Sequence, residues 1–212
     1  MSHLGIRTRM NHIFEWIMVL AWLNTLWLAF TLLGLGLFGW APATVAMLNI
    51  FRRIYQEQSL DLAIFKTFVH EYKVNFFKAN ALGWMMLVLL LILGFSFLTL
   101  PSLTNLSFYL MSGLYLVIVS LFLLMALYVL PAFTHYQTSL VNYFKYALLI
   151  GLSHFHYSLI ILIALVIIYF IFTIFPSLLL FFAVSMPSAL TMYLAMKVFN
   201  HIQRIGATQS NI

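Results

Sequence analysis

The chain has 212 residues, of which 65% are hydrophobic and only 7% are charged. An average soluble domain has about 25% charged residues, so the composition excludes a soluble protein and indicates an integral membrane protein. The net charge of +6 comes from basic residues scattered near the predicted helix ends, which excludes a nucleic-acid-binding patch. Because there is no cysteine, a disulfide framework and a cysteine-based metal site are also excluded.

The apolar runs predict an all-α, polytopic membrane helix bundle that forms a single integral membrane domain over residues 1–212. A spanning helix needs about 20 residues, so the chain has room for about six membrane-embedded helices. Two amphipathic segments are expected to form elbow helices at the cytoplasmic surface. We expect spans at 11–37, 76–98, 108–130, 155–175 and 178–199, a short second helix at 41–58, and elbows at 59–75 and 138–153.

The first apolar stretch is interrupted by Gly34, Gly36, Gly39 and Pro42. Glycine permits backbone conformations that other residues avoid, and proline is favoured at the start of a helix. The apolar part of the helix after the break is only about 15 Å long at 1.5 Å per residue, roughly half the hydrocarbon thickness. Two threadings remain open: residues 11–37 cross the membrane once, or the Pro42 helix returns to the cytoplasm as the second arm of a hairpin.

The distribution of basic residues favours the hairpin. In that threading every Lys and Arg falls on one side of the membrane, which the positive-inside rule assigns to the cytoplasm. The N- and C-termini are then expected to be cytoplasmic as well. The basic residues assigned to the cytoplasmic surface include Arg52, Arg53, Lys66, Lys73, Lys78, Lys145 and Lys197.

A proline also interrupts the last predicted span, at Pro187, and its surroundings resemble those of Pro42. Each proline is followed by a methionine five residues on and by a basic residue ten residues on, Arg52 in one case and Lys197 in the other. Internal repeats are common in transporter folds. A second echo pairs 65–66 and 75–76 with 144–145 and 154–155, each opening a span, and suggests a repeated unit, that is, a weak internal repeat; chance similarity is the alternative for both echoes.

Polar residues inside the predicted spans are candidates for helix packing or for partner contacts. Asn24 lies in the middle of the first span, where a buried amide needs a hydrogen-bond partner. The hydroxyls around Pro187 either satisfy the carbonyl that the proline leaves free or line a polar cavity. The candidate partner or helix-packing residues are Asn24, Trp27, Gly34, Gly36, Gly39, Pro42, Ala43, Thr44, Ser185, Pro187, Ser188 and Thr191.

The sequence contains no pattern that carries catalysis. It has no HExxH motif, no phosphate-binding glycine loop and no pair of carboxylates. His154 and His156 are two residues apart, so on a helix they point to different sides. We therefore expect no catalytic residue, no metal site and no cofactor, and we do not expect an enzyme.

Residues 22–27 (WLNTLW), the glycine-rich turn and residues 39–47 (GWAPATVAM) resemble the YesL family of Gram-positive bacterial membrane proteins. The segments 65–68 (FKTF) and 73–79 (KVNFFKA) are similar to the same family. The resemblance implies a multi-pass protein of the bacterial cell membrane with a domain of unknown function. It also implies a role near sugar uptake, because genes of this family often lie beside carbohydrate ABC importers.

Two functions are compatible with this resemblance. The first is a non-enzymatic accessory subunit of carbohydrate (oligosaccharide) ABC import, which contacts the lipid bilayer and an ABC permease or another membrane subunit. The alternative is a self-contained small-molecule transporter or channel with a cavity near the Gly34–Pro42 break. The EAA-type loop of ABC permeases is absent, so the chain itself is not expected to be an ordinary permease. No nucleic acid is expected as a partner, and sugar binding is left open.

Overall fold

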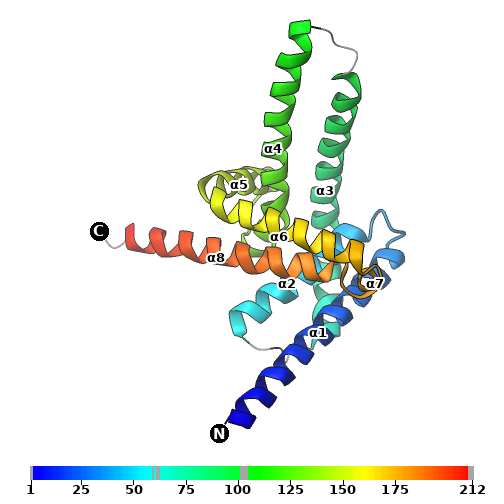
Figure 1. The fold of residues 1–212 in the computed structure, drawn as a ribbon, viewed down its shortest axis with the longest axis vertical. Helices are drawn as coiled ribbons and strands as arrows, with labels where there is room; N and C mark the ends of the chain where they lie inside the picture. The colour runs from blue at the N-terminus through cyan, green and yellow to red at the C-terminus, as the bar shows by residue number, and fades with distance from the viewer. Residues whose placement is uncertain (1, 59, 61–62, 101–104, 210–212) are drawn as a thin grey trace.

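A computed structural model describes residues 2–58, 60, 63–100 and 105–209. Regular structure in these residues is helical, which confirms the predicted all-α membrane bundle (Figure 1). The helices are α1 (Ser2–Leu33), α2 (Trp40–Glu57), α3 (Ile64–Thr99), α4 (Asn105–His135), α5 (Leu140–Ser153), α6 (Phe155–Ile174), α7 (Ser177–Phe182) and α8 (Ser185–Gln209).

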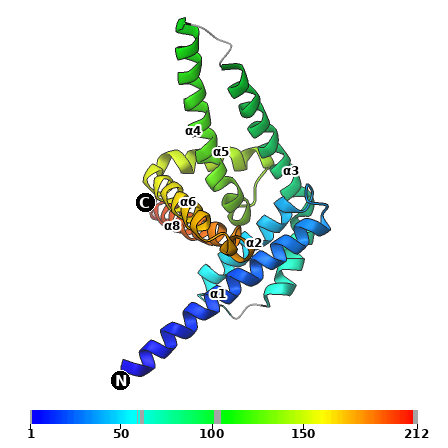
Figure 2. The same ribbon diagram turned by 45° about the vertical axis from the view of Figure 1, so that its right-hand side comes forward.

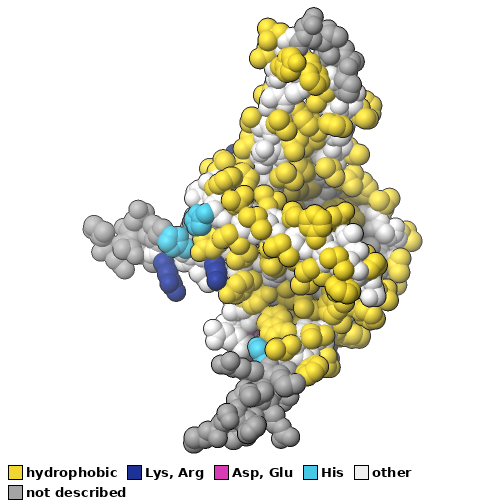
Figure 3. All heavy atoms as spheres, in the orientation of Figure 1, with side chains coloured by type: hydrophobic (Ala, Val, Ile, Leu, Met, Phe, Trp, Pro, Cys, Tyr) yellow, Lys and Arg dark blue, Asp and Glu magenta, His cyan; other side chains and the backbone are white. Residues whose placement is uncertain are grey.

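Four helical segments in the described part of the chain are long and apolar enough to cross a membrane. They are His12–Leu33, Ile64–Thr99, Leu106–His135 and Phe155–Ile174. Much of their apolar surface is exposed, and Figure 3 shows hydrophobic side chains over most of the face formed by α6 and the upper part of α3 and α4. This distribution is what lipid as a solvent favours, so the chain is a helical membrane protein.

Helices α1 and α2 form an antiparallel hairpin. The Trp27 indole donates a hydrogen bond to the Thr44 hydroxyl at 2.8 Å, and the rings of Trp16 and Tyr55 stack 5.8 Å apart. In both pairs the two residues are equally far from the turn in the sequence, as expected for two helices that run in opposite directions. Of the two threadings, the structure therefore forms the hairpin.

The turn between these helices depends on glycine. Gly36 has φ +74°, a conformation that is unfavourable for residues with a Cβ. A Cβ on Gly39 would lie only 2.4 Å from the carbonyl oxygen of Thr31, so the returning chain passes directly against the end of α1. Pro42 is the third residue of α2, where its missing N–H costs no helical hydrogen bond.

Helix α2 is the centre of the fold, although its charged end, with Arg52, Arg53 and Glu57, excludes it from the candidate spans. Most of its residues from Ala41 to Phe51 are buried, and it packs against α1, α3, α4 and α8. Alanines at 41, 43 and 46 are fully buried, which lets neighbouring backbones approach closely. The core around α2 includes Leu23, Phe68, Tyr128, Met192 and Phe199.

The first predicted elbow is not a separate helix. Helix α3 begins at Ile64 and continues without interruption to Thr99, so the amphipathic segment and the following span are one helix of 36 residues. Residues 59, 61 and 62, which belong to the predicted elbow, lie outside the described residues. No glycine or proline separates the two parts, and Phe68, Tyr72 and Ala79 are all buried, which keeps the helix continuous.

The later helices do not end or break at Pro131 and Pro187 as expected. Helix α4 continues through Pro131 to His135, because Ala132, Phe133 and Thr134 are buried and hold the last turn in place. The predicted last span is interrupted at residues 183–184 and not at Pro187. Pro187 is the third residue of α8, as Pro42 is of α2, because a proline is tolerated in the first turn of a helix.

Helices α3 and α4 form a long hairpin that extends away from the other helices (Figures 1 and 2). The base of this hairpin contacts α2 and α5. Helices α6 and α8 run across the base of this hairpin in Figure 1. Helix α5 is a separate short apolar helix, which corresponds to the second predicted elbow. The space at the junction of α2, α3, α4 and α5 contains the polar cavity described next.

Candidate functional site: a polar cavity at the base of the α3–α4 hairpin

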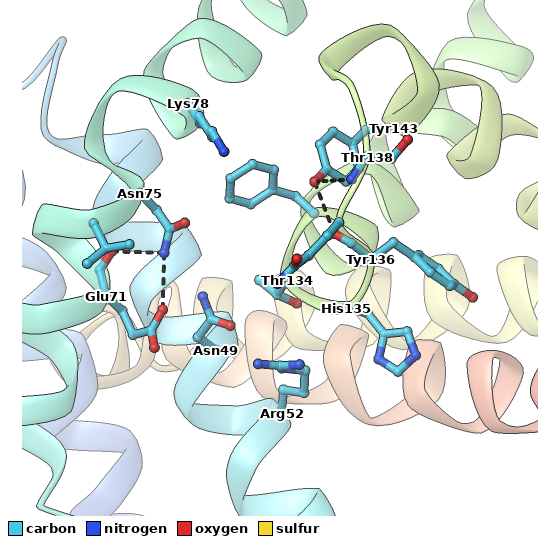
Figure 4. A pocket seen from close by; sticks show the side chains of 13 residues that line it. Asn49, Arg52, Glu71, Asn75, Lys78, Thr134, His135, Tyr136, Thr138 and Tyr143 are labelled. Atoms are coloured by element: carbon cyan, nitrogen blue, oxygen red, sulfur yellow. Dashed lines mark hydrogen bonds between the residues drawn. The ribbon is translucent and has the colours of Figure 1, made fainter.

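A cavity of about 650 Å³ lies between α2, α3 and the link from α4 to α5 (Figure 4). Its volume is within the range of about 300–1,000 Å³ that is typical of small-molecule sites. Its walls are mostly polar, in a chain that is 65% hydrophobic. The cavity is lined by Asn49, Arg52, Glu71, Val74, Asn75, Lys78, Phe133, Thr134, His135, Tyr136, Gln137, Thr138 and Tyr143.

Helical spacing aligns the polar side chains that line the cavity. Asn49 and Arg52 are three residues apart on α2, and Glu71, Asn75 and Lys78 follow one another at intervals of four and three on α3. These intervals place each set on one face of its helix. The third wall is the end of α4 with residues 136–138, where the chain leaves one helix before it enters the next.

The carboxylate that lines the cavity, Glu71, is already paired. Arg53 donates to its Oε1 at 2.9 Å, and the Asn75 amide donates to its Oε2 at 3.1 Å. The Glu71 side chain is 13% exposed and that of Arg53 is 39% exposed, so the pair lies at the edge of the protein interior. Because both carboxylate oxygens have donors, Glu71 orients the Asn75 amide and offsets the charge of Arg53.

Tyr143 holds the α4–α5 link in place. Its hydroxyl donates to the carbonyl of Tyr136 at 3.0 Å and accepts from the backbone N–H of Thr138 at 3.2 Å. The Asn142 amide donates to the Thr138 hydroxyl at 3.2 Å. These contacts fix the link without a regular helix, so the cavity has a defined third wall.

Arg52 lines the cavity and takes part in neither of the two ion pairs of the described residues. Its Nε is buried and has no hydrogen-bond partner, and the same is true of Nδ1 of His135. Burial lowers the pKa of Arg52 from its usual value, while Glu71 opposes the shift, and an arginine stays protonated near neutral pH because its usual pKa is very high. The charge of Glu71 is neutralised by Arg53. Arg52 and Lys78 therefore give the cavity a net positive charge.

Asn24, which the sequence indicated as a packing or partner residue, lies away from the cavity in a closely packed part of the protein. Asn24 is 1% exposed; its amide donates to the carbonyl of Leu180 at 2.8 Å, and its carbonyl accepts from the N–H groups of Val184 and Ser185 at 3.0 and 3.3 Å. Asn24 therefore joins α1 to the break between α7 and α8. In this structure it acts within the chain as a helix-packing residue.

The first turns of α2 and α8, which contain Pro42 and Pro187, also pack against other parts of this protein. Pro42 and Ala43 are buried, and Thr44 receives the hydrogen bond from Trp27. Ser185 is buried, whereas Pro187, Ser188 and Thr191 are half-buried. A Cβ on Gly34 would lie 2.4 Å from the Cα of Gly39, so the break itself is closely packed. The described cavities are lined by other residues.

The basic residues divide between the cavity and the open surface. Arg52 and Lys78 line the cavity, and Arg53 pairs with Glu71 beside it. The ammonium group of Lys197 lies 4.6 Å from the centre of the Tyr193 ring. Lys66, Lys73, Lys145 and Lys197 are exposed outside the cavity.

Sequence reasoning did not identify most of the cavity. Asn49, Glu71, Asn75, His135 and Tyr143 come from four helices and meet only after folding. A partial signal was present, because polar residues recur at helical spacing on α2 and α3 next to apolar faces. The donors available in the cavity suit an anionic or strongly polar ligand. Among the described residues, there is no group of three or more side chains that could hold a metal ion.

Comparison with known proteins gives relatives of unknown function. Residues 20–97 match the family described as "Protein of unknown function, DUF624". The chain is 34% identical to the uncharacterized protein YteU of Bacillus subtilis (strain 168) over 206 residues, which are 97% of this chain and 92% of YteU. It is 41% identical to YesV of the same organism over 65% of each chain, and 27% identical to YesL over 94% of each. No solved structure matches the chain significantly.

Proposed function

The chain belongs to the YesL-like DUF624 family of membrane proteins, and from this premise we propose that it is a non-enzymatic accessory subunit of carbohydrate (oligosaccharide) ABC import. In this proposal the protein packs against the permease of the importer within the bilayer. It has no transport activity of its own. The relatives named above are uncharacterized, so the proposal depends on the implied link to sugar uptake and on the surface that the fold exposes.

The observation that carries the proposal is the uncovered α3–α4 hairpin. Near its far end the two helices meet at the Tyr115 hydroxyl, which is 3.4 Å from the carbonyl of Leu93, and at the ring of Phe97. Gly94 and Gly113 lie next to this contact, and a Cβ on either would meet nothing within 4 Å. Two open glycines at the same height therefore leave backbone accessible on both helices.

Uncovered glycines are suited to a partner helix. Lipid tails are as apolar as leucine, so membrane helices associate through close packing and polar contacts, and small residues permit that approach. The apolar side chains beside the glycines, including Leu91 and Phe95, are exposed. A helix of a permease is a partner of the right shape and polarity for this surface.

We place the protein in the bacterial cell membrane with both termini in the cytoplasm. This orientation follows the positive-inside rule, because the basic residues of α2, α3, α5 and α8 then face the cytoplasm. The polar cavity with Arg52 and Lys78 lies at the cytoplasmic end of the α3–α4 hairpin in this orientation. The outer ends of α3 and α4 carry the permease contact.

Site-specific photocrosslinking in native membranes tests the contact. A photoreactive phenylalanine derivative in place of Phe95 is expected to crosslink to the permease of the importer. The matched control replaces Phe170 on α6, which is also exposed, and is expected to crosslink to lipid or not at all. A Gly94→Leu and Gly113→Leu double variant should lose the crosslink, because the added side chains keep the partner helix away.

Transport measurements separate the two functions. Purified protein alone in liposomes is expected not to move labelled oligosaccharide, whereas deletion of the gene is expected to lower uptake through the intact importer. Saturable uptake by the protein alone would refute the accessory role and establish a self-contained transporter. Unchanged uptake after deletion, together with equal crosslinking from Phe95 and Phe170, would also refute the proposal.

A further inference from the structure

An apolar groove lies beside the polar cavity. Its volume is about 540 Å³, and it is open towards the lipid-exposed surface, since Met85, Val88 and Val141 are exposed. The lining residues come from the same three elements that border the cavity on this side: Trp84, Met85, Val88 and Leu89 of α3, Met125 of α4, and Val141 and Phe144 of α5. None of these side chains is charged.

The cavity and the groove follow one another along the hairpin. On α3, Lys78 lines the cavity and Met85 lines the groove; seven residues separate them, which is two turns on the same face and about 10 Å. On α4, which runs in the opposite direction, Phe133 lines the cavity and Met125 the groove. Both helices thus lead from the polar space to the apolar space in the same direction.

We propose that the cavity and the groove together bind an anionic phospholipid, with its phosphate headgroup in the cavity and an acyl chain in the groove. The ligand class is defined by this order of surfaces: cationic and hydrogen-bonding at one end, apolar and open to lipid at the other. The site is separate from the proposed permease contact at Gly94 and Gly113. It can therefore be tested on purified protein without a partner.

The charges in the cavity select an anion. Figure 4 shows that Lys78 extends into the cavity from α3 and that Arg52 borders it on α2. The nearby carboxylate of Glu71 is occupied by Arg53 and Asn75, so it leaves a net positive charge for the ligand. The Arg52 side chain lines the cavity, and a guanidinium binds a phosphate group through paired N–H donors, which an ammonium group cannot provide.

The first turn of α5 adds to the same preference. Thr138, which precedes this helix, and Tyr143 within its first turn both line the cavity. The N-terminus of a helix carries partial positive charge and favours anions. A phosphate group would thus meet a guanidinium and an ammonium group, while the start of α5 offsets the partial negative charge at the end of α4, where Thr134 and His135 line the same cavity. A headgroup without a net negative charge would leave the excess positive charge of the cavity unbalanced.

The groove decides between a lipid and a soluble phosphate. A soluble phosphate compound would need only the polar cavity, and the exposed apolar groove would have no role in its binding. An acyl chain that continues from the headgroup fills the groove and adds apolar contact with Trp84 and Phe144. The membrane also supplies lipid at high local concentration at the level of the groove.

The test measures lipid binding to the full-length protein by native mass spectrometry from detergent. Phosphatidylglycerol is expected to remain bound about tenfold more tightly than phosphatidylcholine, because only the former has a net negative headgroup. Lys78→Gln is expected to remove most of this preference. The matched control is Lys66→Gln, which removes a charge that is also exposed, on the same helix but outside the cavity. Equal effects of the two substitutions, or no preference between the lipids, would overturn the proposal.

Two further arms test the groove and the source of the phosphate. Val88→Trp fills the groove and is expected to weaken phosphatidylglycerol binding, whereas Val166→Trp on α6, at similar exposure, is expected to have no effect. Glycerol 3-phosphate carries the phosphate group without the acyl chains. Full displacement of the lipid by this compound at equal concentration would assign the cavity to a soluble phosphate ligand and overturn the lipid assignment. Lys78→Gln is the more suitable variant than Arg52→Gln, because Lys78 is exposed whereas Arg52 is half-buried.

Discussion

The substitution Asn24→Leu tests how the last two helices are attached to the first. Leucine has the same branching and number of side-chain heavy atoms as asparagine, although it is bulkier, and it cannot form any of the three hydrogen bonds that the amide makes with Leu180, Val184 and Ser185. Interhelical hydrogen bonds in membrane proteins contribute about 0.6 kcal/mol on average, so three bonds give about 2 kcal/mol. This figure is a lower limit for the loss of stability, because leucine also leaves the backbone N–H groups of Val184 and Ser185 without an acceptor in the protein interior.

Thermal unfolding in detergent, followed by circular dichroism, measures the loss. The Asn24→Leu variant is expected to unfold at a lower temperature than the parent chain and to need less denaturant. Thr25→Val is the matched control, because Thr25 is exposed and its hydroxyl bonds only to the carbonyl of Ala21 within the same helix, at 2.9 Å. If Asn24→Leu and Thr25→Val had the same unfolding midpoint as the parent chain, the three-bond connection would contribute nothing and the reasoning would be refuted.

Three further results are expected. An impermeant thiol reagent added to intact cells should label Ser102→Cys but not Ser2→Cys, because the proposed orientation places the N-terminus inside; labelling of both would contradict it. Gly39→Ala should destabilise the protein, since its Cβ would meet a carbonyl oxygen at 2.4 Å, whereas Gly94→Ala should raise stability by about 0.5–1 kcal/mol because its site is open. Burial, with smaller contributions from two neighbouring histidines, lowers the pKa of His154 below 6.5, so the unfolded chain binds more protons at low pH. Stability should therefore fall as the pH drops through 6.5, and His154→Gln should show a smaller fall in pH-dependent unfolding measurements.

Local patterns were sufficient to predict the class of the protein and much of its helical structure. A run of about 20 apolar residues can satisfy its backbone in lipid only as a helix, so each long run identifies a helix without knowledge of its neighbours. The turn after α1 was also predictable, because glycine and proline restrict or permit backbone angles at their own positions. The buried amide of Asn24 indicated a contact between helices, although its partner at the α7–α8 break could not be identified.

Helix boundaries were less predictable where a local signal had two outcomes. Pro131 and Pro187 each lack an N–H, which interrupts a helix in one setting and is harmless in another. Packing decided between these outcomes: Ala132, Phe133 and Thr134 are buried and continue α4, whereas Asn24 accepts hydrogen bonds at the start of α8 and fixes the break before Pro187. Neither contact is visible in the residues adjacent to the proline.

The sequence by itself determined that this protein is a helical membrane protein whose first apolar stretch breaks at its glycines, because both features depend on the chemistry of neighbouring residues; it favoured a hairpin at this break but left a single crossing open. Only the tertiary structure decided that α2 is the centre of the core and that Arg52, Lys78 and His135 border one cavity. These residues are separated by 26 and 57 positions in the chain. Their proximity depends on how α3 and α4 pack against α2, which is set by shape and burial over the whole molecule and not by any local pattern.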